Sequence, residues 1–254
     1  MGANRNRRRK KKVLTPNQPL TKYGLISFNS IGYGNPTINQ HLQMKKGGLL
    51  DDILDDIDKD FPSNESDETL SELKYIKTKL KRLEARETYE ECVAIDLDLK
   101  RYISEICKET GVPDVSSLID DVESSFLNSL VFKLKFKYNR ARPGQLSFYY
   151  VNQDELNPLK STSSMSPSYP SGHTLEVYVI TDILAHHFPE HKEVFDKIKK
   201  RVAISRILIG AHYPSDNEFS LEIASLIKES PIIKNRYYDN NWDKILKIKK
   251  NETK

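Results

Sequence analysis

Three short blocks of this sequence carry side chains that can bind and attack a tetrahedral anion. The first contains Lys135 and, after six intervening residues, Arg142 followed by Pro143. The second is the tetrapeptide Pro-Ser-Gly-His at residues 170–173, and the third spans residues 205–216. Together they supply three cations, two histidines and one carboxylate, which is the inventory that phosphoryl transfer requires.

The cations and one backbone turn match the needs of a bound phosphate. The planar fork of an arginine, here Arg142 or Arg206, bonds two phosphate oxygens at once, and Lys135 adds a compact charge. Ser171 and Gly172 precede a predicted helix, whose first N–H groups and dipole favour an anion. The serine adds a hydroxyl, and the glycine has no side chain to block close approach.

The two histidines remain for the chemistry itself. Asp216 follows His212 by four residues, so a compact turn brings its carboxylate to Nδ1 of the imidazole. That contact would fix the tautomer and leave Nε2 to attack phosphorus. His173 has no partner nearby in sequence and suits the general acid that protonates the leaving oxygen.

Apolar periodicity predicts an all-α fold, because three- and four-residue steps recur and no sustained strand pattern appears. Residues 21–47, rich in glycine, are expected to be irregular, with a short strand near residues 25–28. Residues 138–170 are expected to form a long connection with several turns. Helices are expected over residues 67–83, 92–110, 113–135, 174–188 and 189–209, after Asp216, and at 242–248.

Charge and periodicity divide the chain into four parts. Residues 1–20 are predicted to be a disordered basic tail, since seven cations and no acid lie in residues 1–12. Subtracting those seven charges from the net +4 leaves −3 for the rest. Residues 21–66 form an irregular N-terminal extension with a short acidic helix. Residues 67–232 form the helical domain, and residues 233–254 form a C-terminal helix and tail.

Composition bounds the compartment and the cofactors. Mean hydropathy is −0.61, no apolar run approaches the ~18 residues of a membrane helix, and no signal peptide is visible. We therefore expect a soluble, cytoplasmic protein. Cys92 and Cys107 lie too far apart along a helix to bridge, and no second Cys or His stands at ligand spacing. No metal site is predicted.

The three blocks resemble the signature of the type 2 phosphatidic acid phosphatase and vanadium haloperoxidase superfamily. Residues 168–174, Ser-Tyr-Pro-Ser-Gly-His-Thr, are similar to the soluble class A bacterial acid phosphatases, and residues 212–216, His-Tyr-Pro-Ser-Asp, fit the same branch. The resemblance covers about residues 68–230. The chain departs from that branch in two respects. No secretory signal is visible in the sequence, and Asn217-Glu218-Phe219 stands where the family usually has a small residue.

The resemblance implies a single helical-bundle domain and a phosphomonoesterase that needs no cofactor or metal. His212 would be the nucleophile that becomes phosphohistidine, His173 the acid for the leaving group, and Asp216 the residue that orients His212. The resemblance also implies which residues bind phosphate: Lys135, Arg142, Ser171, Gly172 and Arg206.

Two alternatives remain open at this point. The same residues would cradle vanadate in a haloperoxidase, although 254 residues is short for that branch. The basic tail also allows a docking role for residues 1–20, towards nucleic acid or another acidic partner, in a structural protein that retains a phosphatase domain. Such a protein could belong to a larger assembly such as a virus particle. The expected substrate is a small phosphomonoester, and nothing selects its leaving group.

Overall fold

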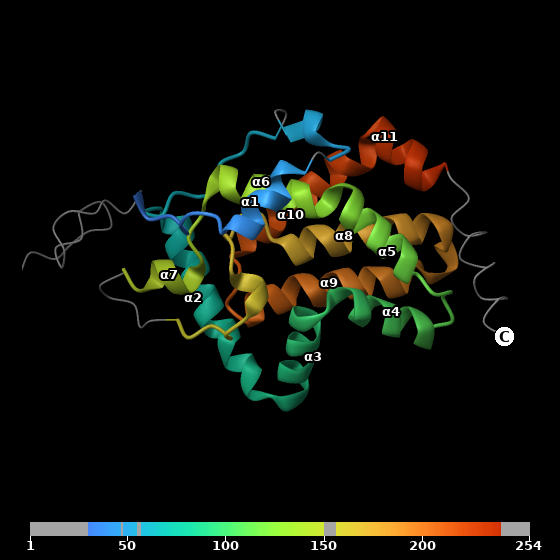
Figure 1. Ribbon diagram of the computed structural model, residues 1–254. Helices are drawn as coiled ribbons and strands as arrows, with labels where there is room; N and C mark the ends of the chain where they lie inside the picture. Colours follow the sequence, from blue (N-terminus) through green and yellow to red (C-terminus); the bar gives the residue numbers. More distant parts are fainter. Residues whose placement is uncertain (1–29, 47, 55–56, 150–155, 240–254) are drawn as a thin grey trace, which may run out of the picture.

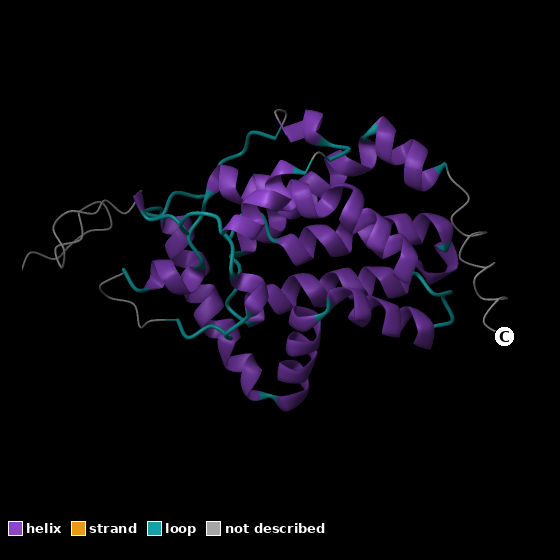
Figure 2. Cartoon of the chain, in the orientation of Figure 1, coloured by secondary structure: helices purple, strands orange, loops and turns teal. Residues whose placement is uncertain are grey.

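A computed structural model describes residues 30–46, 48–54, 57–149 and 156–239. The basic tail at residues 1–20, the short strand expected near residues 25–28 and the helix expected at residues 242–248 lie outside this part of the chain. Within it the protein is all-α, as predicted, with one isolated β-bridge between Gly32 and Arg140 and no strand (Figure 2). None of the described helices is long and apolar enough to cross a membrane.

The centre of the fold is a helix that is apolar on almost every side. Helix α8 (Gly172–His187) packs against both α9 (Lys192–Leu208) and α10 (Pro214–Glu229) (Figure 1). A helix surrounded in this way must be apolar all round. Its buried side chains accordingly lie on more than one face: Leu175, Val177, Val179, Ile180, Ile183 and Leu184.

A continuous helical run forms another wall and carries the first block. It consists of α5 (Ser116–Val122), the π-helical turn η4 (Glu123–Leu127) and α6 (Asn128–Tyr138). The run ends at Asn139, whose left-handed backbone (φ 51°) stops the helix. Lys135 therefore lies in the last turn of α6, and the chain reverses before Arg142 and α7 (Pro143–Ser147).

Three outer helices complete the bundle beside α9. They are α2 (Asp67–Leu80), followed by the 3-10 turn η3 (Lys81–Glu84), then α3 (Arg86–Leu97) and α4 (Leu99–Glu109). The single helix predicted over residues 92–110 is wrong, because the chain breaks at Asp98. The Asp98 carboxylate accepts the backbone N–H of Arg101 at 2.8 Å and thereby caps a new helix.

The N-terminal extension is more ordered than predicted. Helix α1 (Ile38–Lys45) occupies part of the segment expected to be irregular, and it packs on α6. Its signal was a capping box in which Thr37 and Gln40 bond each other's backbone. The acidic helix expected near residues 51–60 is reduced to the 3-10 turn η2 (Asp51–Leu54). Residues 57–63 have no regular structure, and Ile57 is buried in the core.

Shorter turns join the remaining elements. The connection at residues 138–170 contains α7 and η5 (Thr162–Ser164), and η6 (Pro189–His191) precedes α9. The last described elements are α11 (Pro231–Ile233) and η7 (Lys234–Tyr238). Two starts matter for the site. Helix α8 begins at Gly172 and α10 begins at Pro214, so His173 and Asp216 both lie in the first turn of a helix.

Candidate active site

His212 and Asp216 meet at the start of α10. The Nδ1 of His212 lies 3.1 Å from Asp216 Oδ2. The same carboxylate oxygen accepts the backbone N–H of Tyr213 at 2.9 Å and the hydroxyl of Ser168. Because three donors hold this oxygen, the carboxylate cannot rotate away from the imidazole.

The other side of the His212 ring faces Arg142. Nη1 of Arg142 lies 2.8 Å from Nε2 of His212. A guanidinium nitrogen can only donate, so Nε2 accepts and the ring proton is on Nδ1, towards Asp216. Burial and the charge of Arg142 lower the pKa of His212 well below its usual value. The imidazole is therefore neutral, and Nε2 holds a lone pair.

Arg142 is held by main-chain carbonyls and not by a carboxylate. Its Nε donates to the carbonyl of Ser166 and its Nη1 to that of Ala211, both at 2.8 Å. Burial lowers the pKa of Arg142 to about 10, against a smaller opposing effect of Asp216. The side chain thus keeps a full charge at neutral pH, and no carboxylate of the described residues contacts it directly.

Lys135 is anchored in a comparable way. Its Nζ donates to the carbonyls of Pro167 and Pro170, at 2.8 and 2.7 Å. Burial and the nearby charge of Arg142 lower the pKa of Lys135 well below its usual value. Lys135 therefore points into the same cationic region as Arg142, beside the turn that leads into the second block.

Ser171 and Gly172 form the N-terminus of α8. Ser171 is the N-cap residue, and its hydroxyl donates to Thr174 Oγ1 at 2.9 Å. A Cβ added to Gly172 would lie 3.6 Å from Lys135 Cε, so the first turn of the helix lies against the lysine stem. The dipole of this 16-residue helix adds positive potential to that of the lysine.

His173 follows in the first turn of α8. Burial and the charge of Arg206 lower the pKa of His173 well below its usual value, with further contributions from Lys135 and Arg142. All three cations therefore lie close enough to act on this imidazole. The structure brings His173, His212 and the three cations of the blocks into one buried region.

Arg206 has partners on only one of its three nitrogens. Nη2 bonds Asp96 Oδ1 at 2.9 Å and Ser163 Oγ at 2.8 Å. Its side chain is fully buried, yet Nε and Nη1 have no hydrogen-bond partner among the described residues. Buried N–H groups without partners are costly, which marks them as donors for something outside the protein.

The sequence reading missed Asp96, which holds Arg206. It is buried on α3 and also accepts the hydroxyls of Ser161 and Ser163, at 2.7 and 2.6 Å. Burial would raise the pKa of Asp96, but Arg206 and the two hydroxyls outweigh burial and lower it. The available signal was a single acid between Ile95 and Leu97 in an otherwise apolar stretch.

A second missed group lies behind Asp216. Arg140 is fully buried, and its Nη1 bonds Asp216 Oδ1 at 2.6 Å and Ser215 Oγ at 2.8 Å. Nη2 bonds Glu72 Oε2 at 3.1 Å, and the guanidinium lies 3.8 Å from the centre of the Tyr213 ring. Burial opposes ionisation of Asp216, but the charge of Arg140 and the contacts with His212 and Ser168 together outweigh it and keep the pKa of Asp216 below its usual value.

The residues after Asp216 depart from the family pattern in sequence, but Asn217 and Phe219 make specific contacts with their surroundings. Asn217 accepts the hydroxyl of Thr174 and donates to the carbonyl of Ala203, each at 2.8 Å. Phe219 stacks on Tyr169 with a centroid distance of 4.2 Å. The large side chain of Phe219 therefore joins α10 to the segment that precedes α8 by an aromatic contact.

Over the described ranges, no group of three or more His, Cys, Asp or Glu side chains is arranged to hold a metal ion. The region of the three blocks instead concentrates cations around two imidazoles, a composition suited to an anion.

Comparison with known proteins finds phosphatases among the relatives. The chain is 32% identical over 91 residues to the lipid A 1-phosphatase of Rhizobium johnstonii, a match that covers 36% of each protein. It is 31% identical over 126 residues to the non-specific acid phosphatase of Providencia stuartii, covering 46% of each. The chain thus spans less than half the length of these relatives. No protein-family model matches it. The resemblance to phosphatases predicted from the three blocks is confirmed.

Proposed function

We propose that this protein is a metal-independent phosphomonoesterase that works through a phosphohistidine at His212. The observation that carries the proposal is the state of that imidazole. Nδ1–H of His212 donates a hydrogen bond to Asp216, and Nε2 lies 2.8 Å from Arg142 inside a buried cationic region. A neutral nitrogen lone pair next to a cation is what a nucleophile needs in order to attack a dianion.

The phosphate would be held by the donors that the fold leaves available. Arg206 offers its unpartnered Nε and Nη1, and Arg142 can exchange its contact with His212 for a phosphate oxygen. Lys135 and the first N–H groups of α8, at Ser171 and Gly172, supply the remaining charge and dipole. A bound dianion would also offset the mutual repulsion of the three cations.

The reaction then proceeds in two steps, phosphorylation of His212 and hydrolysis of the phosphohistidine. Nε2 of His212 bonds to phosphorus while the bond from phosphorus to the ester oxygen breaks, and that oxygen takes a proton from His173. Asp216 stabilises the positive charge that forms on the phosphorylated imidazole. In the second step water attacks phosphorus, gives a proton to His173, and releases inorganic phosphate and His212.

His173 must be protonated before the first step, and substrate binding can bring this about by raising the pKa of the imidazole. Burial and Arg206 lower the pKa of His173 in the protein alone. A phosphate dianion beside the imidazole has the opposite effect, because it stabilises the imidazolium. The general acid would thus be loaded when the substrate is bound.

The first test is hydrolysis of p-nitrophenyl phosphate in the presence of EDTA. We expect release of phosphate without added metal, and a loss on the order of 10⁴-fold or more in His212→Ala. The control is His41→Ala, since His41 is exposed on α1. An active His212→Ala protein, or activity that EDTA abolishes and a divalent cation restores, would overturn the proposal.

A second test addresses the role of His173. His173→Ala should lose about 10²–10⁴-fold in kcat with an alkyl phosphate, whose leaving oxygen needs a proton. It should lose far less with p-nitrophenyl phosphate, whose leaving group departs as a stable anion. An equal loss on both substrates would show that His173 binds phosphate and does not act as the acid.

A further inference from the structure

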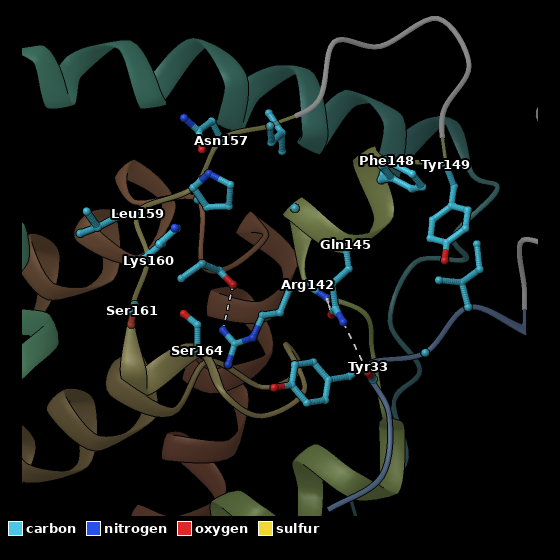
Figure 3. A pocket seen from close by; sticks show the side chains of 17 residues that line it. Tyr33, Arg142, Gln145, Phe148, Tyr149, Asn157, Leu159, Lys160, Ser161 and Ser164 are labelled. Carbon is cyan, nitrogen blue, oxygen red and sulfur yellow. Dashed lines mark hydrogen bonds between the residues drawn. The ribbon is translucent and has the colours of Figure 1, made fainter.

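A cavity of about 710 Å³ opens beside Arg142 (Figure 3). Its size is typical of sites for small molecules, which span roughly 300–1,000 Å³. Three segments form its walls: residues 31–33 of the N-terminal extension, residues 144–149 at α7, and residues 156–161 of the connection. Arg142 of the proposed phosphate site and Ala211, the residue before His212, also line it.

Arg142 links the cavity to the reaction centre. The Arg142 nitrogen that contacts His212 Nε2 also bonds the carbonyl of Ala211 at 2.8 Å. A phosphoryl group bound to Arg142 would therefore lie where the cavity meets the nucleophile. The remainder of the ester, attached to phosphorus on the side away from His212, then has this cavity as its space.

The N-terminal wall is fastened to the first block. The backbone N–H of Tyr33 bonds the carbonyl of Asn139 at 3.0 Å, and that of Gly34 bonds the Asn139 side chain at 3.2 Å. Asn139 is the left-handed residue between Lys135 and Arg142. Figure 3 shows the hydroxyl end of Tyr33 directed towards Arg142. The position of this ring is thus fixed relative to the residues that would bind phosphate.

The opposite wall is equally fixed. Pro158 lies between two glycines, since a Cβ added to Gly144 or Gly210 would come within 2.8 or 2.9 Å of its ring. The backbone N–H of Leu159 bonds the carbonyl of Ile209 at 2.9 Å. Gly210 also has a positive φ of 72°. The segment at residues 156–161 is therefore held against the end of α9, on the other side of Arg142 from Tyr33 (Figure 3).

The lining combines flat apolar surface with cations and neutral polar groups. Tyr33, Phe148 and Tyr149 supply aromatic rings, while Gln145 and Asn157 supply amides. Lys160 adds a second positive charge to that of Arg142, and none of the described residues that line the cavity is acidic. The hydroxyl of Ser164, also in the lining, has no hydrogen-bond partner among the described residues. Rings and amides suit a flat group with polar edges, and the cations suit its phosphate.

We propose that this cavity is the leaving-group subsite, and that Tyr33 selects phosphomonoesters whose leaving group carries a flat aromatic ring, such as aryl phosphates and nucleoside monophosphates. This inference rests on the proposed function, because it assigns the same site a substrate class. It also gives the N-terminal extension a role in specificity.

The experiment compares adenosine 5′-monophosphate with glycerol 3-phosphate as substrates of wild type, Tyr33→Ala and Tyr33→Phe. Loss of a stacked ring should raise KM for the nucleotide about 10-fold in Tyr33→Ala. KM for glycerol 3-phosphate and inhibition by inorganic phosphate should stay within about twofold. Tyr33→Phe should restore the nucleotide KM, since it keeps the ring. Tyr89→Ala, an exposed tyrosine on α3, is the matched control.

Two outcomes would overturn the subsite: equal effects of Tyr33→Ala on both substrates, or no effect on either. Calorimetry with His212→Ala separates this failure from failure of the proposed function. That protein should bind adenosine 5′-monophosphate at least about 10-fold more tightly than inorganic phosphate. Equal affinities would overturn the subsite even in an active enzyme. Tight binding by a wild-type protein that hydrolyses no ester would instead overturn the proposed function and leave the subsite standing.

Discussion

Two fully buried arginines stand on either side of the candidate site, and the protein partners them in opposite ways. Arg140 uses both terminal nitrogens on carboxylates, those of Asp216 and Glu72, and the Tyr213 ring covers its face. Arg206 uses one nitrogen on Asp96 and leaves Nε and Nη1 without partners among the described residues. Arg140 leaves only Nε without a partner among the described residues, whereas Arg206 has a terminal nitrogen as well as Nε left to bind an anion.

The difference teaches how to tell a structural charge from a binding charge. A buried ion pair is expensive to break because the remaining partner is left without compensation. A buried guanidinium with unpartnered N–H groups already carries that cost in the free protein, and a ligand can remove it. Arg140 should therefore contribute mainly to stability and to the position of Asp216, and Arg206 mainly to affinity for phosphate.

The largest expected effect is that of removing Arg140. Arg140→Met leaves Asp216 and Glu72 as buried carboxylates without their cation, so the free energy of unfolding should fall by about 3–5 kcal/mol. Urea denaturation measures this change. Arg101→Met is the control, because Arg101 pairs with Glu105 on the exposed surface of α4 and should change stability by less than about 0.5 kcal/mol.

A loss below about 1 kcal/mol in Arg140→Met would contradict the structural role. Arg140→Met combined with Glu72→Gln offers a further check, since it removes one of the two stranded carboxylates. That double variant should recover part of the lost stability, because Glu72 contacts Arg140 directly.

Removing Arg206 should have a smaller effect on stability and a larger one on binding. In Arg206→Met combined with Asp96→Asn, no uncompensated carboxylate remains, and Ser161 and Ser163 keep a partner at residue 96. Phosphate at 100 times its Kd stabilises a protein by about 2.7 kcal/mol. At that phosphate concentration, we expect this stabilisation in wild type and little of it in the double variant, measured as the shift in thermal unfolding with added phosphate.

If the double variant binds phosphate as wild type does, the proposed contrast between the two arginines is wrong, since Arg206 would then be structural like Arg140. The reverse control is a thermal shift of Arg140→Met with phosphate. That variant is less stable but should still show a clear shift, because its three phosphate-binding cations remain.

The contrast between these arginines also marks what the sequence could predict. Eight residues of the candidate site could be predicted because their types and spacing within short blocks suffice to indicate anion chemistry. They are Lys135, Arg142, Ser171, Gly172, Arg206, His173, His212 and Asp216. The start of α8 followed from the same segment. Arg140 belongs to the first block too, but nothing in the spacing distinguishes it from a surface cation. Its role arises only when Glu72 of α2 and Asp216 of α10 converge on it.

The roles of other residues could not be predicted from the sequence for the same reason. Asp96 reaches Arg206 only because α3 packs on α9. Tyr33 lies 109 positions before Arg142, and it reaches the site through bonds from the extension to Asn139. Sequence patterns describe local chemistry and helix faces, whereas these contacts depend on how distant segments pack.

The smallest predicted effect concerns a second acid near Arg206. Glu176 lies one turn after His173 on α8, and burial together with the charge of Glu123 raises the pKa of Glu176 to about 7. Lys135 and Arg206 oppose this rise. Below pH 7 the carboxyl is mostly neutral and leaves both cations to the phosphate, but above it the new carboxylate competes with phosphate for them.

Inhibition by inorganic phosphate across pH 5.5–8.5 tests whether phosphate binding weakens as Glu176 ionises. The ratio of the inhibition constants of wild type and Glu176→Gln should be near one below about pH 6 and rise severalfold above about pH 8. The ratio cancels the ionisation of phosphate itself, which both proteins share. A ratio that stays flat would show that Glu176 does not face the cations, and Arg206 would then keep Asp96 as its one carboxylate partner. A ratio that rises as expected would mean that the protein sets its affinity for phosphate through the less completely paired of its two buried arginines.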